Sequence, residues 1–121
     1  MKDIDILIVE KLLDRDLKST VKKVNTTVAA FNNTSELYLY NTILAEYTHE
    51  ANDCFLKILP QNITSQTARN RVRGVLYNMD LSMHRRNKKY YIYNNILETS
   101  IEMNNETIEF YKTGGSYYLR D

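Results

Sequence analysis

The chain has 121 residues, of which 43% are hydrophobic and 26% are charged, and its formal net charge is only +1. This size and composition describe one globular domain that can bury a core without disulfides or a structural metal, and they exclude a disordered chain. The longest apolar run, residues 6–9, is too short for a membrane helix, and one cysteine cannot form an internal disulfide. We therefore expect a cytoplasmic protein without a membrane partner.

The small net charge hides an uneven distribution. Residues 64–95 hold seven arginines and lysines against the single acid Asp80, a net charge of +6, which leaves −5 for the rest of the chain. A nearly neutral protein is a poor general binder of polyanions. A charge asymmetry along the chain is nevertheless typical of proteins in which one face meets phosphates.

The N-terminal part of the chain is predicted to be helical. Residues 3–13 are densely apolar and favour a buried helix. From Asp16 to Phe31 the apolar residues are spaced 4, 3, 4 and 3, which predicts a second helix with Asp16 as its N-cap. We interpret residues 1–34 as a helical arm with a possible role in dimerisation.

Three further helices are expected in the middle of the chain. Leu37, Tyr40, Ile43, Leu44 and Tyr47 recur at helical spacing in a segment predicted as a helix from 36 to 49. A short helix over 52–59 ends before Pro60, because proline cannot continue a helix. A helix over 64–79 is capped by Thr64 or Ser65, and its buried stripe comprises Ala68, Val72, Val75, Leu76 and Met79.

After Leu81 the hydrophobic period changes from 3.6 to 2. Residues 82–93 predict a hairpin with its turn near Asn87, followed by a second hairpin about Asn104–Asn105 and a third about Gly114–Gly115. The fold class expected is α+β: N-terminal helices, then a helix-turn-helix with a hairpin, then a C-terminal antiparallel β-meander.

The order of elements in residues 36–94 resembles that of winged helix-turn-helix DNA-binding domains. The stretch "ITSQTARNRVRGVL" is similar to a recognition helix, and "MHRRNKKYYIY" is similar to a wing. The resemblance implies that the helix over 64–79 enters the major groove while the hairpin reaches neighbouring backbone. Within one domain, 1–121, residues 35–95 would then be the winged-helix-like core, and residues 96–121 a β-hairpin extension.

A helical wheel indicates which side chains of the basic segment face outward. Relative to the buried stripe, the outward side holds Gln66, Thr67, Asn70, Arg73, Gly74 and Tyr77. Gln66, Asn70 and Arg73 are expected to face base edges, because their side chains match the hydrogen-bonding groups of adenine and guanine. The cations expected to hold phosphates are Arg69, Arg71, Arg85, Arg86, Lys88 and Lys89.

Other chemistry has little support in the sequence. His49 and His84 are the only histidines, and no metal-ligand spacing accompanies them, so we expect no metal and no other cofactor. Cys54 is interpreted as a buried inert thiol. His84 beside two arginines raises the idea of a small nuclease, but a histidine in a strand of this kind is more often a surface or phosphate-contacting residue, so we expect no catalytic residue and no small-molecule substrate.

The leading hypothesis is a small regulatory protein, phage- or plasmid-encoded, that binds double-stranded DNA as a homodimer. It requires that cations from the helix over 64–79 and the hairpin over 82–93 converge on one surface. The alternative is a viral-type inhibitor that binds a host protein and has no affinity for DNA.

Overall fold

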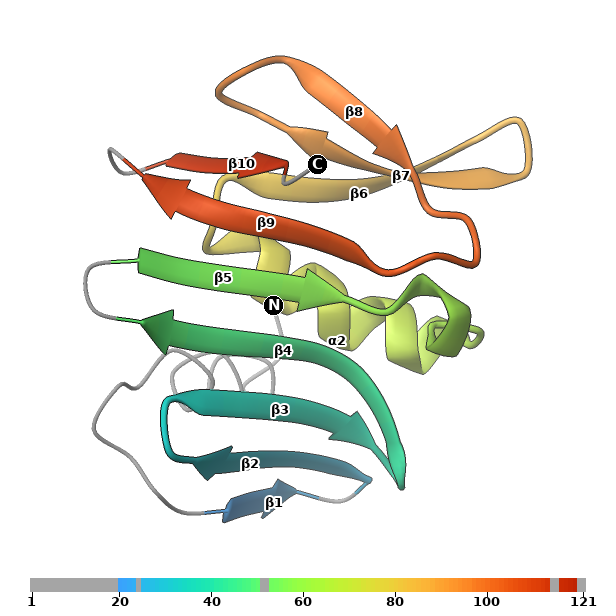
Figure 1. Cartoon of the computed structure of the whole chain (residues 1–121). Coiled ribbons are helices and arrows are strands. Elements are labelled where there is room, and N and C mark those ends of the chain that lie inside the picture. The colour runs from blue at the N-terminus through green and yellow to red at the C-terminus, as the bar shows by residue number, and fades with distance from the viewer. Residues whose placement is uncertain (1–19, 24, 51–52, 114–115, 120–121) are drawn as a thin grey trace.

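The computed structural model describes residues 20–23, 25–50, 53–113 and 116–119, and in this part the chain is mainly β-structure (Figure 1). The first five strands are β1 (Thr20–Lys23), β2 (Thr26–Phe31), β3 (Thr34–Leu39), β4 (Thr42–Glu50) and β5 (Asp53–Ile58). A 3-10 turn, η1 (Pro60–Asn62), and the helix α2 (Gln66–Tyr77) follow. The remaining strands are β6 (Leu81–Arg86), β7 (Lys89–Asn94), β8 (Thr99–Glu102), β9 (Ile108–Thr113) and β10 (Ser116–Leu119).

These strands form two antiparallel sheets. The larger sheet has seven strands in the order β1-β2-β3-β4-β5-β9-β10, and the smaller has three in the order β6-β7-β8. Strands β1 to β5 form a meander, and β9 returns to pair with β5 after the helix and the smaller sheet have been completed. A buried hydrogen bond from Asn94 Nδ2 to the backbone oxygen of Tyr117, 2.8 Å long, joins the two sheets.

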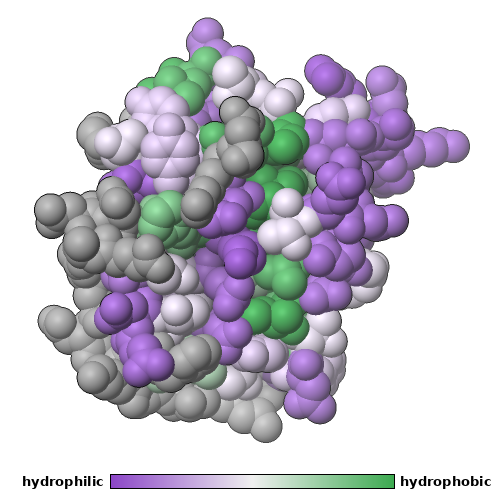
Figure 2. Space-filling model, viewed as in Figure 1, coloured by the Kyte–Doolittle hydropathy of each residue, from purple (hydrophilic) through white to green (hydrophobic). Residues whose placement is uncertain are grey.

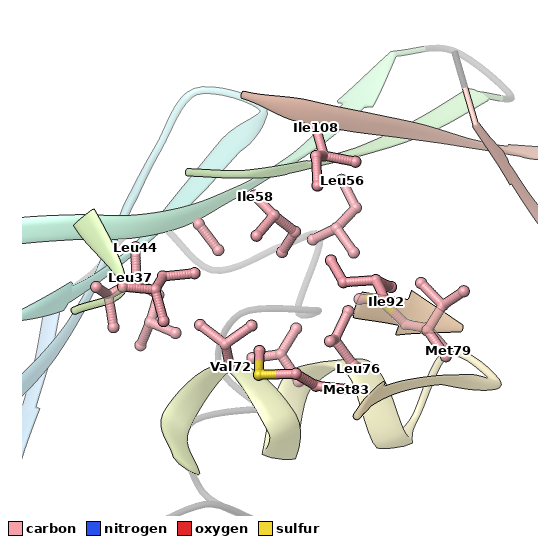
Figure 3. Packing of buried hydrophobic residues seen from close by; sticks show 14 of the residues in the cluster. Leu37, Leu44, Leu56, Ile58, Val72, Leu76, Met79, Met83, Ile92 and Ile108 are labelled. Atoms are coloured by element: carbon pink, nitrogen blue, oxygen red, sulfur yellow. The ribbon is translucent and has the colours of Figure 1, made fainter. Parts of the chain in front are cut away.

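The helix α2 packs on one face of the larger sheet and against β6 (Figures 1 and 3). Leu56 and Ile58 from the sheet, Val72 and Leu76 from α2, and Ile92 from β7 belong to one continuous apolar cluster. Each of them is at most 1% exposed, so the cluster removes large apolar side chains from water and stabilises the contact between the helix and both sheets. This packing fixes the position of α2 relative to the β6–β7 hairpin.

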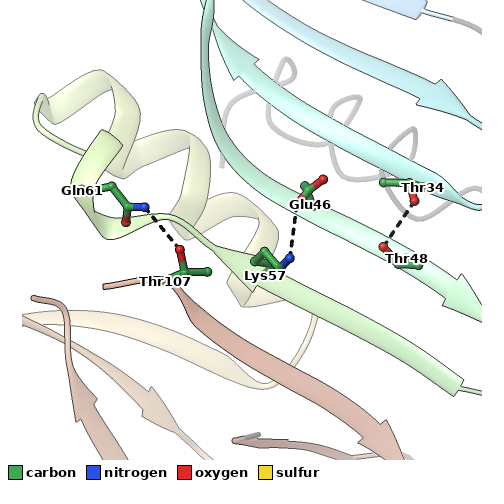
Figure 4. Close-up of polar contacts among 6 residues, drawn as sticks. All are labelled: Thr34, Glu46, Thr48, Lys57, Gln61 and Thr107. Atoms are coloured by element: carbon green, nitrogen blue, oxygen red, sulfur yellow. Dashed lines mark hydrogen bonds and ion pairs between the residues drawn. The ribbon is translucent and has the colours of Figure 1, made fainter. Parts of the chain in front are cut away.

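The opposite face of the larger sheet carries polar pairs between neighbouring strands (Figure 4). Thr34 and Thr48 lie 3.4 Å apart between their hydroxyl oxygens, and Lys57 Nζ lies 3.7 Å from Glu46 Oε2. Gln61 Nε2 donates to Thr107 Oγ1 over 3.2 Å, which ties the turn after β5 to the start of β9. This alternation of buried and polar side chains is the ordinary pattern of a sheet covered on one face.

The predicted α+β fold with N-terminal helices is wrong. Within the described residues, the segments predicted as helices over 16–31, 36–49 and 52–59 contain β1 and β2, β3 and β4, and β5 instead. In β3 the side chains alternate, with Ser35, Leu37 and Leu39 buried, so the period of 2 and not that of 3.6 is the one that the core uses. The predicted helix over 3–13 lies outside the described residues.

The turns between β2, β3 and β4 are the sequence signal that distinguishes these strands from helices. Asn32 and Tyr40 have left-handed backbone angles, with φ of 51° and 55°, and each begins a two-residue connection between antiparallel strands. Asparagine tolerates this conformation because its short polar side chain can bond locally. Because strands replace the two helices that would precede the recognition helix, the helix-turn-helix arrangement is not present in residues 25–94.

Three predictions for the second half of the chain are confirmed. The helix over 64–79 is present as α2, and the Ser65 hydroxyl caps it by accepting a hydrogen bond from the backbone nitrogen of Ala68 over 3.1 Å. The hairpin over 82–93 is present as β6 and β7. Strand β9 pairs with β10, as the hairpin predicted about Gly114–Gly115 requires. The hairpin about Asn104–Asn105 is wrong, because β8 and β9 belong to different sheets.

Among the described residues, none of the helices combines the length and hydrophobicity that a membrane crossing requires.

Candidate nucleic-acid interface

The β6–β7 hairpin carries the most concentrated positive charge in the described chain. Residues 81–97 contain two arginines and two lysines and no acidic residue. The loop between the strands is Asn87–Lys88, and both residues have left-handed angles, with φ of 54° and 65°, which is the geometry of a tight type I′ turn. Residues 84–89 are all exposed, and hydrophilic side chains project at the side where the hairpin ends (Figures 1 and 2).

The cations of this hairpin lie on both of its faces. Side chains alternate along a strand, so Arg85 shares a face with the buried Met83, whereas Arg86 lies on the opposite face. Arg86 is paired in register with Lys89, so both point away from the core. Lys88 occupies the turn. The hairpin tip is therefore surrounded by positive charge and does not present one flat basic surface.

The helix and the hairpin meet at Tyr90. The guanidinium carbon of Arg69, from α2, lies 4.8 Å from the centre of the Tyr90 ring, and that of Arg85, from β6, lies 5.9 Å from the same point. Cations at such distances are attracted to the ring face by roughly 0.5–2 kcal/mol, depending on how far they are desolvated. Tyr90 thus holds one cation from each element close to the junction. On the other face of the hairpin, Arg86 lies 5.2 Å from the Tyr91 ring centre.

The outward side of α2 bears amide side chains, as predicted. Gln66 is exposed and donates from Nε2 to Asn70 Oδ1 over 2.8 Å, and Arg69 Nη2 lies 3.4 Å from Gln66 Oε1. Thr67, Asn70 and Arg73 are half-buried. Tyr77 continues the same side and is 74% exposed. This side can offer both donors and acceptors to a ligand.

Two residues of α2 differ from what the sequence predicts. Gly74 is buried, and its backbone oxygen accepts a hydrogen bond from Asn78 Nδ2 over 3.2 Å. Arg71 is only 8% exposed, and its Nε donates to Thr26 Oγ1 on β2 over 3.0 Å. A guanidinium in this position fastens the helix to the sheet. The expectation that Arg71 holds a phosphate is therefore wrong.

Lys89 is engaged by a carboxylate of its own sheet. Its Nζ lies 3.1 Å from Glu102 Oε1 on β8, and this contact raises the pKa of Lys89. The Lys89 side chain is exposed and that of Glu102 is half-buried, and ion pairs near the surface are weak in water. Glu102 therefore neutralises part of the positive charge of Lys89. The raised pKa keeps Lys89 protonated over the whole physiological pH range.

The sequence predicted both the helix and the hairpin but gave no role to Tyr90. The available signal was its place in the hairpin, because a two-residue loop at 87–88 puts Tyr90 directly opposite Arg85. The contact with Arg69 could not be read in this way, since it depends on how α2 lies against the hairpin.

Two further polar clusters contain a histidine each. His84 Nε2 lies 2.9 Å from the Ser82 hydroxyl, and its ring meets that of Tyr93 edge-on at 6.2 Å. Cys54 Sγ lies 3.6 Å from His49 Nδ1 on the adjacent strand. Within the described ranges, no group of three or more His, Cys, Asp or Glu side chains is placed to hold a metal ion.

Comparison of this chain with protein-family models, with curated proteins and with solved structures found no match in any of the three.

Proposed function

We propose that this protein is a cytoplasmic DNA-binding regulatory protein that contacts double-stranded DNA through the β6–β7 hairpin and the outward side of α2. The observation that carries the proposal is the junction at Tyr90, where Arg69 of the helix and Arg85 of the hairpin converge beside an exposed tip whose own residues, 84–89, include no acid. Exposed cations on a projecting element are the usual means by which proteins hold the DNA backbone.

The structure supports a division of roles among these residues that differs from the one predicted. In this division the phosphates are held by Arg69, Arg85, Arg86, Lys88 and Lys89, with Thr67 as a neutral hydroxyl donor at the edge of the helix. Gln66, Asn70 and Arg73 are the residues able to offer hydrogen bonds to base edges. Arg71 has no part in binding, because it is buried against Thr26. The proposal rests on the charges of α2, β6 and β7 and not on a winged-helix fold.

The salt dependence of binding tests the proposal directly. If about five phosphates are neutralised, the logarithm of the affinity falls against the logarithm of the salt concentration with a slope of about −4.5. The measurement is fluorescence anisotropy of a labelled duplex of random sequence, titrated with the full chain at several salt concentrations. A slope near zero, or no binding at low salt, would contradict the proposal.

Charge-removing variants assign the effect to the hairpin. Replacing Arg85, Arg86 and Lys88 together with glutamine removes three cations from exposed positions and should make the slope less steep by about 2.7. The matched single comparison is Arg86→Gln against Lys57→Gln, because Lys57 lies on the far face of the larger sheet in an ion pair with Glu46. Arg86→Gln should weaken binding, and Lys57→Gln should leave it unchanged.

A pull-down from host lysate separates this function from the alternative of a host-protein inhibitor. With DNA binding, captured material is lost after nuclease treatment. A defined host protein that survives nuclease treatment, together with no affinity for duplex DNA, would support the inhibitor instead. The homodimer stays a prediction, and sedimentation equilibrium of the free protein would test it.

A further inference from the structure

We propose that the β6–β7 hairpin, and not α2, is the element that enters the major groove, and that the ligand is specifically a B-form duplex. This inference rests on the proposed DNA-binding function and deepens it, because it names the groove and the helical form. It reverses the roles that a winged helix would have, in which the helix enters the groove and the hairpin stays beside it.

The shape of the hairpin suits a groove. Strand β8 pairs with β7 from Tyr91 to Asn94, so the part of the hairpin that is only two strands wide is its tip around Asn87 and Lys88, where the strands lie about 4.8 Å apart. The major groove of B-form DNA is about 12 Å wide and admits a two-stranded ribbon. Every residue from 84 to 89 is exposed, and the ion pair that has to open when this tip is inserted is that of Lys89 with Glu102.

The distribution of charge also suits a groove better than a flat surface. Arg85 lies on one face of the ribbon, Arg86 and Lys89 lie on the other, and Lys88 lies at the end. A groove is lined by phosphates along both of its walls, so cations on both faces of an inserted ribbon each approach a phosphate. Against a flat array of phosphates, one of these two sets would point away.

The helix α2 is set back from the tip. Thr67, Asn70 and Arg73 are half-buried, and Arg69 is turned toward Tyr90, which pairs with Arg85 directly behind the Arg86–Lys89 pair that closes the turn. With the ribbon in the groove, this arrangement puts α2 at the rim, where Arg69 meets backbone phosphates. Gln66 and Asn70 would then contact the edge of the site and not its centre.

The form of the duplex follows from groove dimensions. The major groove of A-form RNA is deep and narrow, and side chains cannot read it. A ribbon with arginines on both faces is wider than a bare backbone, so it should be excluded from that groove. Binding to an RNA duplex would then be limited to weak contacts between the cations and the outer phosphates.

The experiment compares four probes of one sequence with the full-length protein at one salt concentration: a DNA duplex, an RNA duplex, single-stranded DNA, and a DNA duplex with bulky groups at C5 of its pyrimidines. The C5 position faces the major groove, where thymine carries its methyl group. The unmodified DNA duplex should bind at least about tenfold more tightly than the RNA duplex and the C5-modified duplex, a difference of about 1.4 kcal/mol.

Equal affinity for the RNA duplex, or indifference to the C5 groups, would overturn the groove assignment while leaving DNA binding intact. Absence of binding to every probe would instead overturn the proposed function. Variants provide a second readout: Arg85→Gln with Arg86→Gln should reduce the discrimination between the unmodified and the C5-modified duplex more than Gln66→Ala with Asn70→Ala. The reverse order would assign the groove to α2.

Discussion

The junction at Tyr90 makes a quantitative prediction about how the helix and hairpin act together. Replacing Tyr90 with leucine removes the aromatic ring but no cation. Arg69 lies 4.8 Å from the ring centre and is half-buried, which corresponds to about 1 kcal/mol, and Arg85 at 5.9 Å is exposed, which corresponds to about 0.5 kcal/mol. If this stabilisation is lost from the bound arrangement, affinity for duplex DNA falls by about tenfold.

The salt dependence distinguishes this positioning role from a direct phosphate contact. Because Tyr90→Leu leaves every cation in place, the slope of log affinity against log salt should stay as in the original protein, whereas Arg85→Gln should reduce it by about 0.9. Tyr90→Phe keeps the ring and serves as the matched control, with affinity expected to be nearly unchanged. Both quantities come from anisotropy titrations over a range of salt concentrations.

The result that would refute this reasoning is unchanged affinity in Tyr90→Leu. The partly buried position of Tyr90 requires one further measurement, because a loss of folding could imitate a loss of positioning. Urea denaturation of each variant separates the two. A variant that is fully folded at the assay temperature, yet binds as tightly as the original protein, shows that the ring does not position the two arginines.

The remaining predictions concern the buried polar contacts. Arg71→Met should lower the free energy of unfolding by about 1–3 kcal/mol, because Thr26 Oγ1 loses its buried donor. The slope of log affinity for DNA against log salt should not change. A changed slope would show that Arg71 contacts DNA. The hydroxyls of Tyr47 and Tyr117 lie 2.9 Å apart in the core. Each single replacement by phenylalanine should lower the free energy of unfolding, measured by urea denaturation, by about 1–2 kcal/mol, and the double replacement should lower it by less than the sum. Strict additivity would show that the two hydroxyls do not interact. Burial raises the pKa of both phenols above the usual value of 10.0, so the folded state keeps their protons longer than the unfolded state. Their stability contribution is complete below pH 10.0 and is lost as the pH rises above it, and unfolding curves at increasing alkaline pH should show this loss in the original protein but less in the double variant.

Local signals in the sequence were sufficient for α2 and for the β6–β7 hairpin. Ser65 is a cap that acts within one turn, and the stripe from Ala68 to Met79 matches only the helical period. The change to a period of 2 after Leu81 is equally local. These elements hold the basic residues, which is why the sequence alone indicated the region of the candidate site.

The strands before α2 were not determined locally. Leu37, Ile43, Leu44 and Tyr47 satisfy a helical period, and Leu37, Leu44 and Tyr47 are also buried in a sheet, so their spacing does not choose between the two structures. The choice comes from pairing with neighbouring strands. Each strand of the meander satisfies its backbone groups and buries one face only when the next strand is present.

The detailed roles of the cations were likewise decided by tertiary structure. A helical wheel gives the direction of Arg71 but not what covers that direction, and the covering residue, Thr26, lies 45 positions away on β2. Lys89 meets Glu102 because β8 pairs with β7, and Arg69 meets Tyr90 because α2 packs against the smaller sheet. Charge and local periodicity are properties of the chain itself, whereas burial and contact partners depend on which distant segments the fold brings together.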